Sequence, residues 1–461
     1  MAQNETPELT LRLRWWNRAK EFTGTTRGRI TVVGLVLAVT LTFDYNLAQR
    51  HGFFDLNVYH GAINYWVHGG GSLYDFLSPQ TTYGFTYPPF AALVMLPMAL
   101  LAFNPTIWLS CIFCVVATVF LVQILVDPLA RRQGWVRWYA VLLVTAFAVA
   151  FEPLRETFLF GQVNIYLVLL VAVDLLVLMR RGSRFTGVGI GLATAIKLTP
   201  AVFLIYLLVT KRWKAAIVGS VTAAVATVLA AAIAPSASRV FWTDALWNTD
   251  RIGSVAFISN QSLNGAIARL NPGNPSTAAW LASVVVVMVI WAFRVRKAVA
   301  AGDEATGFAL TGVLGCLISP ITWVHHLVWV GPAVLLLLDH ALAARTKRRR
   351  NWLLAFLICS FVLLCSRLVW AFSDNFGSPI TWPFASAYVW MSLILLFFTP
   401  IREPAAVPVQ GPLEVETEPQ FREIDREFAG LLDDERAPAA VRTEPVAFVE
   451  GQPTRVAREH P

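Results

Sequence analysis

Long apolar runs separated by short basic clusters dominate this chain of 461 residues. The runs do not alternate polar and apolar residues, as strands of a membrane barrel would. Lipid offers a backbone no hydrogen-bond partners, so long continuous runs favour membrane-spanning helices. The pattern predicts an all-α polytopic integral membrane protein. The runs cover residues 30–48, 88–103, 105–126, 138–151, 163–179, 185–196, 199–210, 215–234, 276–293, 304–318, 327–344, 352–372 and 384–399.

Basic clusters lie between these runs, and the positive-inside rule predicts that they face the cytoplasm. They are Arg131-Arg132, Arg180-Arg181 and residues 211–214, 294–297 and 345–350. Thirteen alternating spans could not place all five clusters on one side. All five clusters face the cytoplasm if 88–103 stays outside as a half-span and 185–210 is a cytoplasmic hairpin. Each arm of that hairpin would cover about 18 Å, less than the ~30 Å of hydrocarbon, so we expect about ten full spans plus two short broken segments.

Charge divides the chain into three predicted regions. Residues 1–29 form a basic cytoplasmic N-terminus whose charges precede the first run, as in an uncleaved anchor. Residues 30–400 form the membrane body, with a large outer loop at 44–87. Residues 401–461 hold 7 arginines, no lysine and 13 acidic residues, against a net charge of +8 for the whole chain. This Pro- and Glu-rich cytoplasmic tail is expected to be disordered, with a short helix at 420–432.

The charge and cysteine patterns exclude two classes of site. The basic residues cluster at the ends of apolar runs, which favours topology anchoring over nucleic-acid binding. All five cysteines lie within apolar runs, and no second Cys/His pair follows the zinc-like spacing of Cys111 and Cys114. We expect no metal, no cofactor and no disulfide framework.

The outer loop 44–87 is much longer than a turn requires, and its first part resembles a surface helix. In such a helix Asp55 and Tyr59 share a face and Asn57 lies beside them. Asp55 has a structural interpretation as a helix cap and a functional one as a carboxylate in an apolar cleft. Asp44 and Asp75 compete for the functional role, but Asp44 ends a span and Asp75 lies in a Gly-rich turn.

Lys197 is a second isolated charge, between two short apolar arms and shortly before Pro200. It could extend its ammonium to the cytoplasmic surface. Because basic clusters bracket the hairpin at both ends, Lys197 is instead predicted at its tip, pointing into the protein. A buried ammonium needs an anion, and a lipid phosphate is the expected partner.

The charges predict further outer loops at 152–162, 235–275, 319–326 and 373–383, and amides and aromatic residues gather in or beside them, at the outer ends of the runs. Arg155, Gln162 and Asn164 lie near one end, and Asn260 and Gln261 near another; they could cap helices or bind a sugar. The segment SPITWVHHLVWV begins at residue 319 and places Trp323 before His325 and His326. Adjacent histidines on a helix point about 100° apart, so one is expected in the cleft and the other in the packing. Trp323 offers a stacking face for a sugar or an interfacial anchor.

Taken in order, the segments FTYPPF (85–90), GQVN (161–164), KLTP (197–200), NQSLNG (260–265) and SPITWVHH (319–326) resemble glycosyltransferase family 87. These are the polyprenyl-phosphate-mannose-dependent α-mannosyltransferases of actinobacteria, including enzymes that add α-1,2 mannose to phosphatidylinositol mannosides and lipomannan. The resemblance runs from residue 44 to 330. It implies the GT-C architecture, a plasma-membrane location and an active site in the first outer loop, facing the periplasm.

The resemblance also implies a role for each candidate residue. Asp55 becomes the base that deprotonates the acceptor hydroxyl in an inverting transfer from polyprenyl-phosphate-mannose to a glycolipid acceptor. Binding of the donor phosphate falls to Lys197, His325, His326 and Arg155. Binding of sugar or acceptor falls to Asn57, Tyr59, Tyr87, Gln162, Asn164, Asn260, Gln261 and Trp323.

Two other functions remain open from the sequence. An arabinofuranosyltransferase would use decaprenyl-phosphate-arabinose with the same arrangement of residues. A lipid or sugar transporter or flippase would pair broken helices across an internal repeat, and would place charges near the membrane midplane. The sequence shows no such repeat, and its polar residues gather in the outer loops.

Overall fold

The computed structural model describes residues 17–47, 51–79, 81–247 and 253–402 of the chain. Within these ranges the protein is helical, and the only strand-like pairing is an isolated antiparallel bridge between Leu77 and Gly84. The chain is an all-α protein, as predicted. The predicted tail helix at 420–432 lies outside the described residues, as do residues 1–16 of the N-terminal region and 403–461 of the tail.

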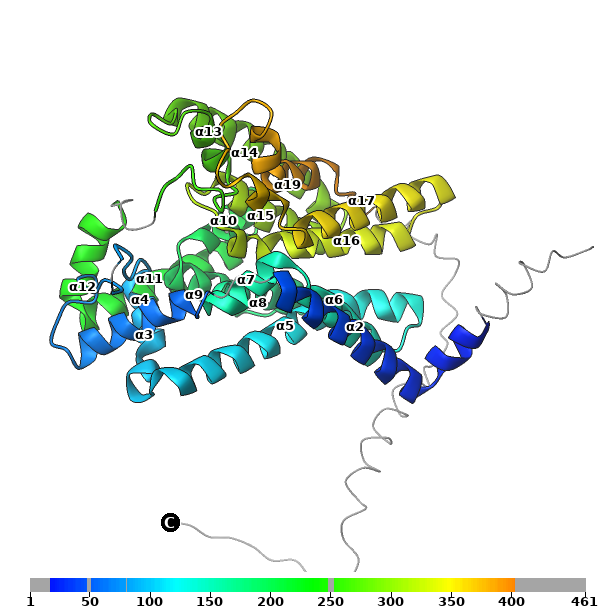
Figure 1. The fold of residues 1–461 in the computed structure, drawn as a ribbon, viewed down its shortest axis with the longest axis horizontal. Helices are drawn as coiled ribbons and strands as arrows, with labels where there is room; N and C mark the ends of the chain where they lie inside the picture. The colour runs from blue at the N-terminus through cyan, green and yellow to red at the C-terminus, as the bar shows by residue number, and fades with distance from the viewer. Residues whose placement is uncertain (1–16, 48–50, 80, 248–252, 403–461) are drawn as a thin grey trace, which may run out of the picture. The chain divides into compact units, whose positions relative to one another are not determined.

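Helices α2 to α10 contain the first half of the fold (Figure 1). They are α2 (Thr26–Leu47), α3 (Phe54–Val67), α4 (Pro89–Met95), η1 (Leu96–Leu100), α5 (Phe103–Gln133), α6 (Arg137–Val149), α7 (Glu152–Phe160), α8 (Asn164–Ala172), η2 (Val173–Leu178), α9 (Val188–Ile196), η3 (Thr199–Ala201) and α10 (Val202–Val209).

The described part of the second half is also helical. It comprises α11 (Trp213–Ile233), α12 (Pro235–Val240), η4 (Phe241–Ala245), α13 (Leu263–Leu270), α14 (Thr277–Ala300), α15 (Glu304–Ile318), η6 (Val324–Val330), α16 (Gly331–Leu342), α17 (Lys347–Cys365), η7 (Leu368–Phe372), α18 (Trp382–Ala385) and α19 (Ala387–Phe398).

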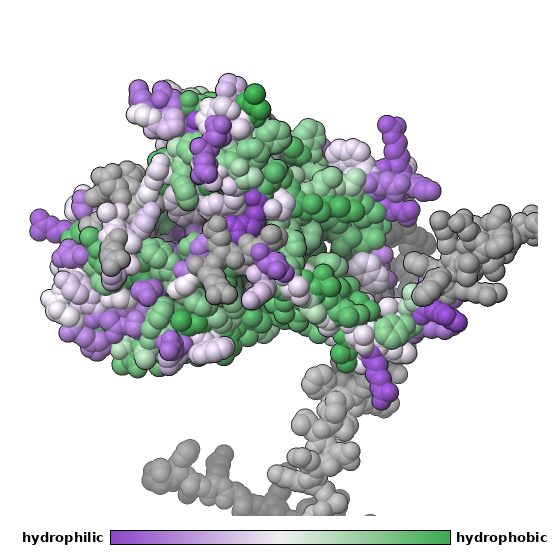
Figure 2. Space-filling model, viewed as in Figure 1, coloured by the Kyte–Doolittle hydropathy of each residue, from purple (hydrophilic) through white to green (hydrophobic). Residues whose placement is uncertain are grey.

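Among the described residues, five helical stretches are long and apolar enough to cross a membrane: α2, α5, α11, α14 and the continuous pair η6–α16. A sixth appears if α6 and α7, which meet at a bend of 75°, count as one broken span. Large apolar side chains of α11, such as Val221 and Val225, are exposed rather than packed. The visible face in Figure 2 carries broad hydrophobic areas, as expected for a surface covered by lipid. The protein is thus an integral membrane protein, and the count of about ten full spans stays a prediction.

The loop 44–87 contains the predicted helix. Helix α3 begins after Phe53 and ends at His68, where the Gly-rich segment follows. It packs on the returning chain through a core of its own, which includes Tyr59, Tyr74 and Phe85. Pro88 and Pro89 start α4 because proline suits the first turn of a helix. Helix α4 and η1 together form only a short apolar segment, as predicted for 88–103.

Residues 152–162 are not the outer loop that the charges predicted. They form α7, a helix whose charged side chains are buried and which packs against η6. Glu152 accepts hydrogen bonds from Trp370 and Tyr388, and Arg155 pairs with Asp44. These partners come from distant segments, which is why the local charge pattern resembled a loop. The hydrogen bonds to Glu152 and the ion pair of Arg155 with Asp44 offset the cost of burying these charges.

The predicted break at Lys197 is confirmed. Helix α9 ends there because Lys197 adopts an extended conformation, with φ −149° and ψ 131°. At the other end of α9, the carboxylate of Asp174 accepts hydrogen bonds from the backbone N–H groups of Gly187 (2.7 Å) and Ile190 (2.8 Å). Asp174 therefore satisfies donors that the first turn of a helix leaves free. Helix α9 also packs closely on α11, where Gly191 and Gly219 allow the backbones to approach.

Candidate active site

Asp55 lies in the first turn of α3, at the base of the returning loop. The N-cap residue of that helix is Phe53, and no side chain caps it, so the capping interpretation of Asp55 is wrong. Instead, Asp55 Oδ2 accepts a hydrogen bond from Gln162 Nε2 at 2.7 Å. Gln162 follows α7, and the backbone N–H of Phe53 donates to Leu159 O at 3.1 Å. The start of α3 is thus fixed to the end of α7.

A chain of hydrogen bonds connects this carboxylate with the returning loop. Tyr87 donates its hydroxyl hydrogen to Gln162 Oε1 at 2.9 Å. The hydroxyl groups of Tyr59 and Tyr87 also lie 2.9 Å apart, one turn along α3 from Asp55. Both phenols are buried. Asp55, Tyr59, Tyr87 and Gln162 therefore belong to one hydrogen-bonded cluster.

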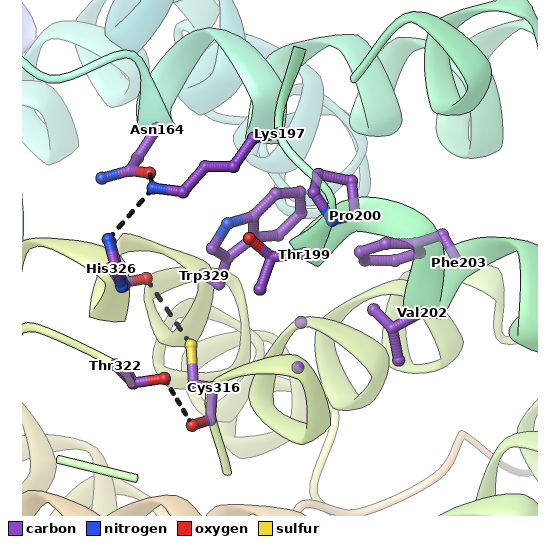
Figure 3. A pocket seen from close by; sticks show the side chains of 12 residues that line it. Asn164, Lys197, Thr199, Pro200, Val202, Phe203, Cys316, Thr322, His326 and Trp329 are labelled. Carbon is purple, nitrogen blue, oxygen red and sulfur yellow. Dashed lines mark hydrogen bonds between the residues drawn. The ribbon is translucent and has the colours of Figure 1, made fainter. Parts of the chain in front are cut away.

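Lys197 joins the same cluster from the break between α9 and η3. Its Nζ lies 2.9 Å from Asn164 Oδ1, 3.0 Å from His326 Nε2 and 3.3 Å from the hydroxyl of Tyr87. Figure 3 shows the Lys197 side chain reaching between Asn164 and His326 at one side of a pocket. The remaining wall of this pocket is largely apolar, with Val202, Phe203, Gly312, Gly315 and Trp329.

The two histidines diverge, as predicted for adjacent positions on a helix. Their rings lie 4.6 Å apart and are nearly perpendicular, at 85°. His326 faces Lys197, whereas the ring of His325 lies against Phe160 and its Nε2 has no hydrogen-bond partner. Trp323 contributes its backbone N–H to His326 Nδ1 at 3.2 Å, and its ring packs edge-on against Phe257.

Four other predicted residues lie away from this cluster. Asn57 is exposed on α3. Arg155 is buried and donates to Asp44 at 2.7 Å. Asn260 accepts from the backbone of Thr322 at 2.9 Å. These contacts give Arg155 an ion-pair partner and make Asn260 a support for the backbone of residues 319–324, and the predicted binding roles of these residues stay predictions. Gln261 acts in the same way, because its side chain donates to Ile258 O and Ala385 O.

The environment of Asp55 raises its pKa towards neutral pH. Burial raises its pKa from 3.8 to about 6, although the Gln162 hydrogen bond lowers it. Burial also raises the pKa of Tyr59 and Tyr87 above the usual 10, so both phenols remain neutral hydrogen-bond groups. A carboxylate with a pKa of about 6 is a stronger base than an exposed one and is still ionised at neutral pH.

Some residues near the site were missed from the sequence. His51 lies 2.7 Å from Glu156 and stacks on Phe160, so it is placed between α7 and the start of α3. Asp174 fixes the helix that ends at Lys197. A single acid inside the apolar run 163–179 was the available signal for Asp174. His51 offered no comparable signal, because its partner is more than 100 residues away.

The described residues contain no group of three or more His, Cys, Asp or Glu side chains that could hold a metal ion. The cluster instead combines one carboxylate, one amine, an imidazole, two phenols and two amides. The carboxylate and the amine lie on either side of the Tyr87–Gln162 pair. This arrangement suits removal of a proton on one side and binding of an anion on the other.

Comparison with known proteins points to one family. The model of glycosyltransferase family 87 matches residues 85–320. A polyprenol-phosphate-mannose-dependent alpha-(1-2)-phosphatidylinositol mannoside mannosyltransferase of Mycobacterium tuberculosis is 34% identical over 67% of this chain and 74% of its own length. A corresponding pentamannoside mannosyltransferase of Mycolicibacterium smegmatis is 33% identical over 70% and 79%.

A more distant relative has a different sugar in its name. An alpha-(1->3)-arabinofuranosyltransferase of Corynebacterium glutamicum is 24% identical over 68% of this chain and 75% of its own length. No solved structure matches the chain. The family model covers half of the sequence, and the mannosyltransferase relatives agree over more than two thirds of their length. The chain therefore belongs to glycosyltransferase family 87.

Proposed function

We propose that this protein is an inverting mannosyltransferase that uses polyprenyl-phosphate-mannose. Its acceptor is a phosphatidylinositol mannoside or lipomannan, with an α-1,2 linkage. The observation that carries the proposal is the Asp55 carboxylate, which the Gln162–Tyr87 pair connects to the Lys197 amine. The names of the mannosyltransferase relatives support the choice of donor and acceptor.

The cluster provides both halves of a direct displacement. Asp55 removes the proton from an acceptor hydroxyl, and the resulting oxygen attacks the anomeric carbon of mannose. The bond between that carbon and the donor phosphate oxygen breaks on the opposite face, so the configuration inverts. Lys197 and the imidazole of His326 stabilise the negative charge that collects on the departing phosphate. A lysine in this place supplies the charge that a metal ion supplies elsewhere, so the proposed reaction uses neither a metal nor a cofactor.

The pocket beside Lys197 suits a lipid-linked donor. Its polar side carries Lys197, Asn164 and His326, and its apolar side is formed by α10, α15 and Trp329 of η6. A phosphate at the polar side would leave an attached polyprenyl chain against apolar surface, where its burial is favourable. Neutral Tyr87 lies between Lys197 and Gln162, the residue that bonds to Asp55, and Tyr59 bonds to Tyr87. Both hydroxyls can hydrogen-bond sugar hydroxyls.

The test measures mannose transfer by the full chain in lipid nanodiscs. Asp55→Asn keeps the size of the side chain but removes the base, and we expect the rate to fall by about 10²–10⁴-fold. Asp75→Asn is the matched control, because Asp75 is an exposed acid in the same loop. Near-normal transfer by a folded Asp55→Asn protein would contradict the assignment of the base.

The same assay distinguishes the alternative functions. Polyprenyl-phosphate-mannose and decaprenyl-phosphate-arabinose are supplied separately, each with a phosphatidylinositol mannoside acceptor. Covalent transfer of mannose supports the proposal, whereas transfer of arabinose alone would make the protein an arabinofuranosyltransferase, in line with the more distant relative. Movement of either lipid across the bilayer of sealed proteoliposomes, without transfer, would favour a flippase.

A further inference from the structure

Three polar atoms surround the amine of Lys197, and each has a defined hydrogen-bonding role. Asn164 Oδ1 is an amide oxygen and accepts. The hydroxyl of Tyr87 donates its own hydrogen to Gln162, so it too accepts from Lys197. Two of the three positions around Nζ are thus acceptors. The role of His326 Nε2, the third atom, depends on which ring nitrogen carries the hydrogen.

A backbone contact determines which ring nitrogen of His326 carries the hydrogen. The N–H of Trp323 donates to His326 Nδ1 at 3.2 Å, so Nδ1 is the acceptor nitrogen of the ring. A neutral imidazole then carries its hydrogen on Nε2, which faces Lys197 Nζ at 3.0 Å. An ammonium has three donors and no acceptor, so one of its N–H groups would point at another N–H. A neutral amine has two donors and one lone pair, and these match two acceptors and one donor.

We propose that Lys197 is a neutral amine while the donor site is empty, and that binding of the donor phosphate draws one proton from solvent onto its Nζ. The inference rests on the proposed function, since the anion is the phosphate of the lipid-linked donor. No covalent bond changes except the new N–H. The resulting ammonium turns from His326 Nε2–H to a phosphate oxygen. Lys197 therefore gains its positive charge together with the anion that it neutralises.

Other titratable groups surround the pair. They are Asp55 and Tyr59 on α3, Tyr87 in the returning loop, Cys316 on α15, His325 on η6 and, further out, His51 paired with Glu156. Among the described residues, no carboxylate bonds directly to Lys197, and Asp55 reaches it only through Gln162 and Tyr87. An empty site thus gives a Lys197 ammonium no adjacent counter-ion. The donor phosphate supplies one.

Proton uptake on binding has a measurable sign. The donor is a phosphodiester with a constant charge near neutral pH, so the extra proton must bind to the protein. Asp55, with a pKa of about 6, is ionised at about pH 8 and has no proton to pass to Lys197, so the proton comes from solvent. Donor affinity should fall about tenfold for each unit of rising pH once the free amine is neutral.

The experiment is isothermal titration calorimetry of the full chain in nanodiscs, with farnesyl-phosphate-mannose as a short-chain donor. Titrations at about pH 8 in HEPES and in Tris, which have different ionisation enthalpies, give the number of protons taken up. We expect close to one proton per donor for the unaltered protein. We expect none for Lys197→Arg, which should still bind the donor, because a guanidinium is always charged.

Two histidine variants test the cause. A glutamine in His326→Gln can turn its carbonyl oxygen to Lys197 and let the lysine keep its third hydrogen, so uptake should fall below half a proton. His325→Gln changes the adjacent buried ring, which does not contact Lys197, and should keep uptake near one. Full uptake in His326→Gln would overturn the inference.

The outcomes also distinguish the inference from the proposed function. Donor binding without proton uptake in the unaltered protein would overturn the inference alone. It would mean that the hydrogen of the His326 ring lies on Nδ1, which leaves Nε2 to accept from an ammonium. No binding of the donor would contradict the proposed function and the inference together.

Discussion

Asp55 acquires its chemistry from its surroundings rather than from its place on α3. Burial makes the carboxylate more basic, and the Gln162 hydrogen bond limits that effect while fixing the direction of one oxygen. The two effects together leave the group ionised at neutral pH but close to its pKa. A base tuned in this way is sensitive to the one amide that bonds to it.

The rate of transfer should therefore follow the ionisation of Asp55. Only the carboxylate accepts the acceptor's proton, so kcat/KM should fall about tenfold per unit as the pH drops below about 6, the raised pKa. Gln162→Leu removes a hydrogen bond that stabilises the carboxylate, so its pKa should rise and the midpoint of this acid limb should move to higher pH. Initial rates between about pH 5 and 8 check both expectations.

The control for this shift is Asn57→Ala, an exposed change on the same helix, which should leave the midpoint in place. An unchanged midpoint in Gln162→Leu would mean that another group titrates in the acid limb.

At this scale the sequence predicted some roles and missed others for a physical reason. Asp55 and Lys197 could be identified because a lone charge in an apolar run needs a partner. Asn164 and Asn260 looked equivalent, since both are amides near the ends of apolar runs. One bonds to Lys197, and the other bonds to the backbone of Thr322. The choice depends on contacts between segments far apart in the chain, which residue type does not determine.

Helix α7 is the element that positions the base. It ends at Gly161, whose φ of +69° is readily adopted by glycine only. A Cβ at this position would lie 2.5 Å from the Cβ of Leu56, next to Asp55 in α3. The sequence predicted α3 from the spacing of its residues but described α7 as a loop. The charges of α7 are buried by partners on α2, η7 and α19, and a local pattern contains no information on such partners.

The contact between these two helices can be tested with one methyl group. Gly161→Ala should push the start of α3 away from Gln162, and a displacement of about 1 Å can lower transfer about 10²-fold. Gly182→Ala is a matched control: its φ is +63°, but a Cβ there meets no atom within 4 Å. Both substitutions should cost about 1–2 kcal/mol of stability through the left-handed backbone.

Thermal unfolding and transfer rates, measured on the same preparations, separate the two effects. Equal loss of transfer in both variants would show that strain, rather than the contact with Leu56, controls the position of Asp55.

For the whole molecule, the apolar pattern predicted the class of fold, and its count of about ten full spans stays a prediction. Long uniform helices such as α5 and α14 are recognisable from their own composition. The bend between α6 and α7 is not, because a bend changes how far the same apolar length reaches. The break between α9 and α10 was predicted, because each arm is too short to cross the hydrocarbon. Gln162 and Lys197 of the active site lie at the ends of α7 and α9 in these broken elements. Interrupted helices bring backbone ends and polar side chains together inside a membrane domain, provided that protein surrounds them.

We propose that the site faces the periplasm of a bacterial plasma membrane, and this orientation gives the last prediction. The Arg180-Arg181 cluster should lie in the cytoplasm by the positive-inside rule, and the Gly-rich end of α3 should lie outside. With the five native cysteines replaced, His68→Cys and Arg184→Cys each introduce one thiol at an exposed position. A membrane-impermeant maleimide should label His68→Cys in intact cells and Arg184→Cys only after the membrane is opened. The reverse pattern would place Asp55 on the cytoplasmic side, where a periplasmic acceptor could not reach it.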